Sequence, residues 1–151
     1  MTSRFAISVH ILGMLAVFER SKPGCSMTSN AIAKSICTHP VVVRKVMAEL
    51  QRAGIIETRR GAGGGARLAR CASTITLRQV YESIGRDEVL FTTPPGGPNE
   101  KCAVAPHINT WLTVLFNDIE EVLKSRLGEI TLCRLQATVY DQMMACCHND
   151  D

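Results

Sequence analysis

The chain has 151 residues, of which 46% are hydrophobic and 21% charged, so it is too apolar to be disordered and long enough for one compact domain with an appended helical arm. Its net charge of +3 is unevenly spread, because residues 1–75 carry eleven Lys and Arg against three acids and residues 76–151 carry six against eleven. A positive field in one half attracts polyanions such as nucleic acid, although a merely soluble basic surface gives the same totals.

The first predicted element is an apolar helix that follows Arg4. The apolar run 5–18 contains Ser8 and His10 and is shorter than the roughly 20 residues that cross a bilayer. No small-residue cleavage motif follows it, as a secretory signal would require. We therefore expect a buried helix over about 3–20, apolar on nearly every side and covered by the rest of the fold.

Two further helices separated by a tight turn are predicted next. Thr28 or Ser29 caps a short helix that runs to about residue 37, and the turn CTHP follows. Thr38 or His39 then caps a helix that starts at Pro40 and stops before Gly54. This arrangement is typical of a helix-turn-helix, whose second helix buries one face and exposes the other. The face that we expect to be exposed consists of Val42, Arg44, Lys45, Ala48, Glu49 and Arg52.

A glycine-rich hairpin follows the helix-turn-helix. Strands are expected over 55–60 and 66–70, and the tip between them holds Gly61, Gly63, Gly64 and Gly65. The spacing G-x-G-x-x-A also fits a dinucleotide fingerprint, but no helix follows it as that fingerprint requires. A glycine tip flanked by arginines can instead enter a minor groove, because it allows close approach while the arginines reach phosphates. A solvated hairpin turn remains the alternative.

The second half is predicted to be helical, with one long connection. Thr76 begins a helix that runs to about residue 84, residues 85–106 form a loop, and a long helix covers about 104–127. Thr131 caps a last helix over about 132–144. Apolar residues on the long helix repeat at steps of four and three, which is typical of a coiled-coil seam against a partner chain. These predicted dimer-interface residues are Ile108, Leu112, Leu115, Ile119 and Val122.

Five segments of the chain resemble sequences of the Rrf2 family of bacterial winged-helix regulators. They are TSRFAISVHIL, TSNAIAKSI, THPVVVRKVMAELQRAGIIETRRGAGGGARLAR, ITLRQVYESIG and NEKCAVAP. The resemblance covers nearly the whole chain, and the wing motif R-G-x-x-G-G followed by x-x-L-A is its most specific part. It implies a mainly α fold with a small β-hairpin, in which a winged helix-turn-helix domain (1–84) and a loop region (85–103) precede a dimerisation helix and C-terminal helix (104–151). It also implies a cytoplasmic homodimer whose long helices cross, and a near-palindromic operator in double-stranded DNA as partner.

The resemblance also places DNA contacts on this sequence. Arg44 is expected to bond a guanine edge, Val42 to touch a thymine methyl, and Lys45 and the wing arginines to bind phosphates. By position, the expected DNA-binding residues are Arg4, Ser29, Thr38, His39, Val41, Val42, Arg44, Lys45, Arg59, Arg60, Gly61 and Arg67.

The chain departs from the family in two ways. Members that hold an iron-sulfur cluster carry three cysteines in the loop before the long helix, whereas this loop has only Cys102, so we expect no cluster and no metal site. The usual wing aromatic is replaced by Ala66, which is expected to loosen the packing of the wing.

The seven cysteines have irregular spacing and contain no C-x-x-C pair, which favours reduced thiols in a cytosolic protein over a disulfide framework. Cys25, Cys37 and Cys133 are expected to pack as small hydrophobes. Cys102 is a candidate redox sensor, because the start of the long helix should lower its pKa. A partly buried structural role is the alternative for this cysteine.

We therefore predict a sequence-specific DNA-binding transcriptional regulator, a homodimeric repressor that is thiol-responsive if Cys102 acts as a sensor, and not an enzyme. One alternative is a helical protein-interaction module that uses the long helix without DNA. A thiol enzyme built on Cys102 and His107 is the other, but Pro106 separates the pair and no third group is evident to orient them.

Overall fold

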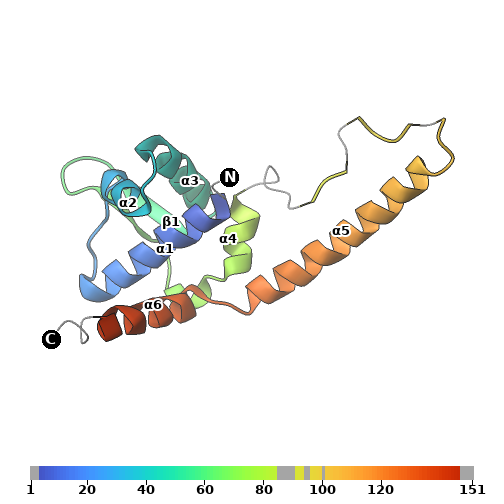
Figure 1. Ribbon diagram of the computed structural model, residues 1–151. Coiled ribbons are helices and arrows are strands. Elements are labelled where there is room, and N and C mark those ends of the chain that lie inside the picture. The colour runs from blue at the N-terminus through green and yellow to red at the C-terminus, as the bar shows by residue number, and fades with distance from the viewer. Residues whose placement is uncertain (1–3, 85–90, 94–95, 100, 147–151) are drawn as a thin grey trace.

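The computed structural model describes residues 4–84, 91–93, 96–99 and 101–146, which form a helical body with one small hairpin (Figure 1). The predicted fold class is confirmed. In chain order the described elements are α1 (Arg4–Ser21), α2 (Ser29–Ile36), α3 (Pro40–Arg52), β1 (Ile56–Arg59), β2 (Gly65–Leu68), the 3-10 turn η1 (Ala72–Thr74), α4 (Leu77–Ser83), α5 (Ala105–Gly128) and α6 (Leu132–Cys146).

Helix α1 is the centre of the body. It packs against α2, α3, α4, α6 and β2, so the expectation that this apolar helix is covered by the fold is confirmed. Ile11 and Leu12 are fully buried in one cluster with residues such as Ile32 of α2, Val46 of α3 and Leu132 of α6. Each such side chain contributes roughly 1.5–3 kcal/mol by its burial. The core thus joins the first and last helices of the chain.

Local sequence sets the geometry of α2 and α3. The Thr28 hydroxyl accepts the backbone N–H of Ala31 at 3.2 Å and so caps α2. Cys37 ends α2 in the left-handed region at φ 55°, which turns the chain toward the start of α3. Pro40 occupies the first turn of α3, where its missing N–H costs nothing. The two helices are therefore joined by three residues, as a helix-turn-helix requires.

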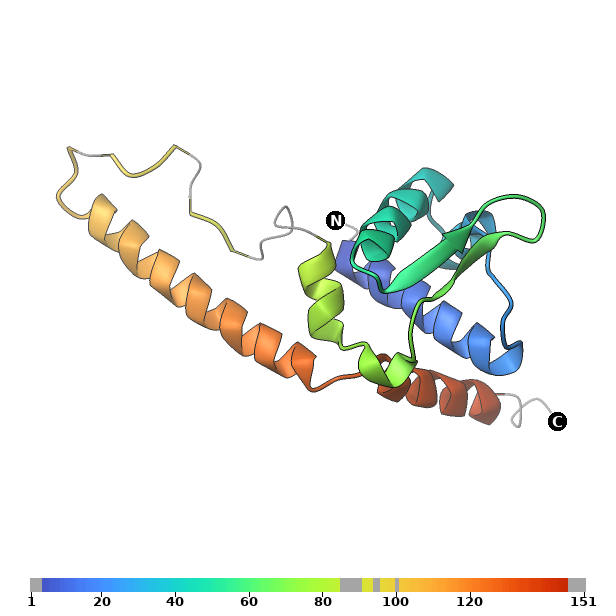
Figure 2. The ribbon, with the colours of Figure 1, turned by 180° about the vertical axis from the view of Figure 1, so that it is seen from behind.

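The wing consists of β1, the tip 60–64 and β2. The strands pair antiparallel, with Thr58 opposite Ala66 and Arg59 opposite Gly65 (Figure 2). Ala66 is fully buried, and its backbone makes two hydrogen bonds to Met27, at 2.7 and 2.9 Å. The wing is therefore attached to the segment before α2 through the backbone of Ala66, and the expectation that its small side chain loosens the packing stays a prediction.

Two wing glycines are required by close backbone contacts. A Cβ on Gly65 would lie 2.5 Å from the carbonyl oxygen of Met27, and one on Gly64 would lie 2.4 Å from that of Arg59. Neither contact can be relieved by moving a flexible side chain, because both partners are backbone atoms. The geometry of the hairpin and its contact with Met27 thus account for these two residues without any ligand.

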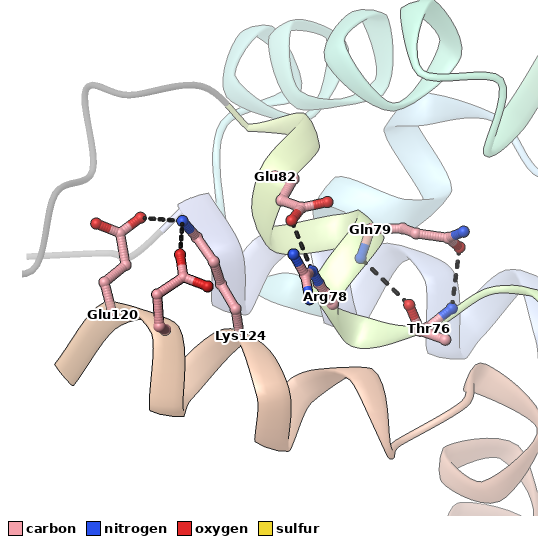
Figure 3. Close-up of polar contacts among 7 residues, drawn as sticks. Thr76, Arg78, Gln79, Glu82, Glu120 and Lys124 are labelled. Atoms are coloured by element: carbon pink, nitrogen blue, oxygen red, sulfur yellow. Dashed lines mark hydrogen bonds and ion pairs between the residues drawn. The ribbon is translucent and has the colours of Figure 1, made fainter. Parts of the chain in front are cut away.

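Helix α4 contacts α1 and α3 on one side and the long helix α5 on the other (Figure 3). A capping box starts it, in which the Thr76 hydroxyl accepts the Gln79 N–H and the Gln79 side chain accepts the Thr76 N–H. Beside it on α5, the Lys124 ammonium lies 2.9 Å from Glu120 and 3.1 Å from Glu121. The backbone of residues 75–77 also bonds to that of 130–132, which fixes α4 against the turn between α5 and α6.

Helix α5 extends away from the body as a rod, whereas α6 turns back beside α1 (Figures 1 and 2). At 24 residues α5 is about 36 Å long. The Gln136 side chain of α6 donates to the carbonyl of Ala16, and the guanidinium of Arg20 lies 4.1 Å from the ring centre of Tyr140. The expected unit 104–151 joins α5 and α6, whereas in the structure α6 packs against α1. Within the described residues, no helix is both long and apolar enough to span a bilayer.

Candidate nucleic-acid interface

A groove lies between α3 and the wing, with a volume of about 480 Å³. We call it the α3–wing groove. It brings together side chains from the start of α2, the outer face of α3 and both strands of the wing. Its lining residues are Thr28, Ser29, Arg44, Met47, Ala48, Gln51, Thr58, Arg59, Arg60, Gly64 and Gly65.

The α3–wing groove is positively charged. Among the described residues that line it are three arginines and no acid. Arg44 comes from α3 and Arg59 and Arg60 come from the wing, and all three are exposed. A concave surface with charge of one sign concentrates its field on a polyanion that enters it. Four of the predicted DNA-binding residues, these arginines and Ser29, therefore share one surface.

The start of α3 presents a second group of predicted residues beside this groove. Val41 and Val42 are exposed despite being apolar, and Lys45 is exposed one turn further on. His39 has a local role, because its Nδ1 accepts the Val41 N–H at 3.2 Å and caps α3. Thr38 is half-buried in the preceding turn. The valines and Lys45 are thus available to a ligand, whereas the His39 ring already holds the start of the helix.

Two predicted contacts lie away from the groove. Arg4 bonds Glu49 of α3, with Nη1 and Oε1 3.1 Å apart and the two side chains only 19% and 10% exposed. Glu49 is buried, so its assignment to the exposed face of α3 was wrong: the position is turned toward Arg4 of α1. Arg67 forms an ion pair with Glu57, its partner across the strands. Arg67 and Glu57 line a separate concavity of about 460 Å³ with residues of α1 and α6.

Sequence reasoning did not assign three polar residues of the groove to DNA binding: Gln51, Thr58 and Thr28, the last of which was expected only as a helix cap. The Thr58 hydroxyl donates a hydrogen bond to Gln51 Oε1 at 2.9 Å and so joins the wing to α3. Helical spacing could have identified Gln51, which lies seven residues after Arg44 and hence on the same face. The bond to Thr58 could not have been found in this way, because it depends on how the hairpin packs.

The outward face of α5 carries a stripe of exposed apolar side chains. At 3.6 residues per turn its members fall within an arc of roughly 80°. Of the predicted interface, Ile108, Ile119 and Val122 belong to it. Leu115 falls within the same arc and Leu112 just outside it, and both are half-buried. Trp111, at 63% exposure, was missed because the seam was counted one position away from it. We call the following residues the α5 stripe: Val104, Ile108, Trp111, Ile119 and Val122.

Two cysteines have a lowered pKa. At Cys102 the backbone N–H groups of Val104 and then Ala105, at the start of α5, lower the pKa of the thiol. At Cys71 a hydrogen bond from the Ser73 side chain is the main cause of a lowered pKa. Both thiols are exposed, so the partly buried alternative for Cys102 does not describe this chain.

Three other cysteines correct an expectation. Cys25, Cys37 and Cys133 are exposed rather than packed as small hydrophobes. Cys25 lies in the loop after α1, Cys37 occupies the turn after α2, and Cys133 lies on the outer side of α6. The local sequence around them does not reveal that the fold leaves these positions uncovered.

Comparisons with known proteins agree with this geometry. The model of the Rrf2 family, described as an iron-dependent transcriptional regulator, matches residues 1–138. The chain is 32% identical over 130 residues to YwnA of Bacillus subtilis (strain 168), which is named as an HTH-type transcriptional regulator; the match covers 86% of this chain and 92% of YwnA.

Two solved structures share the fold. A DNA-binding protein is 29% identical, with a TM-score of 0.67 over 88% of this chain and 98% of its own. A transcriptional regulator from Lactobacillus plantarum is 22% identical, with a TM-score of 0.74 over 100% of this chain and 99% of its own. The winged-helix architecture is thus found over nearly the full length of both chains.

The iron dependence in the family description does not fit the residues of this chain. The loop before α5 supplies the single thiol of Cys102, where a cluster-binding loop would need three. In the described part of the chain, no three side chains of His, Cys, Asp or Glu gather where they could hold a metal ion. These residues therefore give no basis for a cluster-dependent step.

Proposed function

Because the chain belongs to the Rrf2 family and is a DNA-binding transcriptional regulator, we propose that it binds a near-palindromic operator as a homodimer through the α3–wing groove. The observation that carries this proposal is the convergence of Arg44, Arg59 and Arg60 on one acid-free groove. A duplex fits such a surface, because its phosphates lie on both sides of a groove that admits a helix.

Within this interface the residues have different tasks. Arg44, Val41 and Val42 on the outer side of α3 face base edges in the major groove, where Arg44 bonds a guanine and a valine contacts a thymine methyl. Ser29, Lys45, Arg59 and Arg60 bind phosphates or the narrow minor groove. Gly61, at the exposed tip, leaves room for the backbone to approach the duplex. His39 positions the start of α3 as its cap.

We propose that the α5 stripe is covered by the same helix of a second copy. An exposed apolar face on a rod that leaves the body is typical of a dimerisation surface. Two winged parts held by crossed rods contact two half-sites, which is why the operator has two-fold symmetry.

Several further properties follow from this proposal. A compact dimer on a promoter excludes polymerase without an additional domain, which makes repression the expected action. A regulator of this kind works in the compartment that holds the chromosome, and we place it in the cytoplasm. The relatives are transcriptional regulators, and we propose no catalytic role for Cys102 and His107.

The test is selection of bound fragments from random duplex DNA, followed by titration of the selected operator at several salt concentrations. We expect a near-palindromic site and an affinity that falls steeply as salt increases. Arg44→Ala should lose about 1–3 kcal/mol of discrimination at one base pair in each half-site. Arg60→Ala should weaken binding to all sequences and lower the salt slope by about one for each half-site.

Arg67→Ala is the matched control, because it removes the same charge from the wing at a residue already paired with Glu57. We expect it to change operator affinity less than Arg60→Ala does. Selection of unrelated fragments, or equal behaviour of all three arginine variants, would contradict the assignment of the groove.

A second property, a response to oxidants, is favoured by the geometry at Cys102. The start of α5, the helix that we propose sets the distance between the two half-site domains, lowers the pKa of the exposed Cys102 thiol. Oxidation of the wild-type protein should then change operator affinity, whereas oxidation of Cys102→Ser should not. Unchanged affinity of the oxidised wild type would remove this property and leave the DNA-binding proposal intact.

A further inference from the structure

At one rung of the hairpin, hydrogen bonds join the wing to the rest of the fold on two sides, in addition to the packing of Ile56 and Ala66 in the core. On one side the Thr58 hydroxyl donates a hydrogen bond to Gln51 Oε1 of α3, with the two oxygens 2.9 Å apart. On the other side Ala66 and Met27 exchange two backbone hydrogen bonds, at 2.7 and 2.9 Å. Thr58 and Ala66 are partners in the strand register, so both attachments meet at one level.

This level lies just below the residues proposed to contact DNA. The next rung pairs Arg59 with Gly65, and the tip that contains Arg60 follows directly. A hairpin attached on one side could still rotate about that edge, and a small rotation at its base would move the tip away from a duplex held by α3. The second attachment, the solvent-exposed bond between Thr58 and Gln51, restricts this rotation. On the Met27 side the two backbones approach so closely that there is no room for a Cβ on Gly65.

From this arrangement we propose that Gln51 is a positioning residue for DNA binding: its side-chain amide holds Thr58, and thereby fixes the angle between the wing and α3 at which Arg44 and Arg60 reach the same duplex. The inference rests on the proposed use of the α3–wing groove. It assigns Gln51 no contact with a base.

The competing role for Gln51 is direct reading of adenine. A glutamine that reads adenine uses its carbonyl and its amide nitrogen together, whereas here the carbonyl already accepts the Thr58 hydroxyl. Gln51 also lies in the last turn of α3, while recognition helices contact bases with their N-terminal residues. Position and bonding therefore both favour the positioning role.

The inference is tested by a double-mutant cycle on the operator selected by the wild-type protein. Gln51→Ala and Thr58→Val each remove one partner of the bond, and each should weaken operator binding by about three- to tenfold for each half-site. The double variant should bind no worse than the weaker single variant, because both changes remove one interaction. Thr58→Ser keeps the hydroxyl and should restore near wild-type affinity.

Two readouts separate positioning from a general loss of structure or from base reading. In Gln51→Ala, the base preference of the selected fragments and the salt slope should both stay unchanged. By contrast, Arg44→Ala should alter the base preference, and Arg60→Ala should alter the salt slope. Without DNA, amide hydrogen exchange should become faster in the wing of Gln51→Ala and Thr58→Val, while exchange in the buried part of α1 stays as in the wild type.

The possible failures are distinguishable. A relaxed preference at one base pair in Gln51→Ala would overturn the inference in favour of base reading, and additive losses or wild-type affinity in both single variants would overturn it as well. If Arg44→Ala and Arg60→Ala still weaken binding in such a result, only the positioning role fails. If the arginine variants also bind normally, the use of the groove itself is wrong.

Discussion

Arg4 and Glu49 form a largely buried ion pair, 3.1 Å between Nη1 and Oε1, that connects the first turn of α1 to the recognition helix α3. The second oxygen of this carboxylate, Oε2, is buried without a hydrogen bond among the described residues. The carboxylate thus depends strongly on the guanidinium. An arginine that the sequence suggested as a phosphate contact thus also supports the helix that carries the groove.

We predict that Arg4→Ala lowers the free energy of unfolding by about 2–3 kcal/mol, because it leaves the charge of Glu49 buried and unpaired. Chemical denaturation followed by circular dichroism measures this loss. Arg4→Ala combined with Glu49→Gln should recover part of the stability, since the unpaired charge is then absent. A stable Arg4→Ala protein that binds DNA weakly would instead restore Arg4 as a phosphate contact.

The wing glycines give a second prediction. Gly65→Ala should weaken operator binding at least tenfold, because a Cβ placed 2.5 Å from the Met27 carbonyl oxygen must displace the backbone that holds the wing. Binding is measured by fluorescence anisotropy of a labelled duplex. Gly96→Ala is the matched control, since a Cβ at that position has no neighbour within 4 Å. Equal affinities of the two variants would show that the wing attachment at Met27 is dispensable.

The α5 stripe gives a third prediction. Val122→Glu places a charge in the proposed interface, at a side chain that is 71% exposed in the single chain, and should convert the protein to monomers with intact secondary structure. Sedimentation velocity detects the change. Asn117→Glu, an exposed position on the opposite side of α5, should leave the assembly unchanged.

Trp111 provides an independent measure of the same interface, because it is the only tryptophan of the chain. On dilution of the wild type its emission should shift to longer wavelength as the indole becomes hydrated. A dimeric Val122→Glu, or emission that does not depend on concentration over the range in which the mass changes, would place the interface elsewhere.

The cysteines give a fourth prediction, on pH dependence. The pKa of Cys102 and that of Cys71 are lowered in the folded protein. Both thiols therefore lose their protons at a lower pH than an ordinary cysteine thiol does. Alkylation followed by mass spectrometry should therefore have its midpoint at lower pH for the folded than for the denatured chain.

Ser73→Ala separates the two thiols, because it removes the main cause of the shift at Cys71. It should move the Cys71 midpoint upward and leave the Cys102 midpoint unchanged. Since a lowered pKa favours the folded state above the unfolded pKa, this contribution to stability is lost as pH falls through the folded pKa. If the alkylation midpoint of Cys102 is the same in folded and denatured chains, the start of α5 does not lower its pKa.

Much of the fold follows from local signals in the sequence. Thr28 caps α2 and Thr76 caps α4, because each hydroxyl accepts a backbone N–H of the first turn of its helix. Pro40 begins α3, because it has no N–H that would lack a partner there. The α3–wing groove was also foreseeable in outline, since Arg44 and the arginines of the hairpin belong to a recognisable helix-turn-helix and wing.

What the sequence could not determine is which charged and polar groups remain available. Arg4, Arg44 and Arg67 carry the same side chain, yet Arg4 is paired with Glu49 from 45 residues away, Arg67 is paired across the strands, and Arg44 faces the groove. The bond between Gln51 and Thr58 and the outward direction of Trp111 have the same origin. Local structure depends on neighbours along the chain, whereas the partner of a long side chain depends on which distant elements pack beside it, and only the tertiary structure decides that.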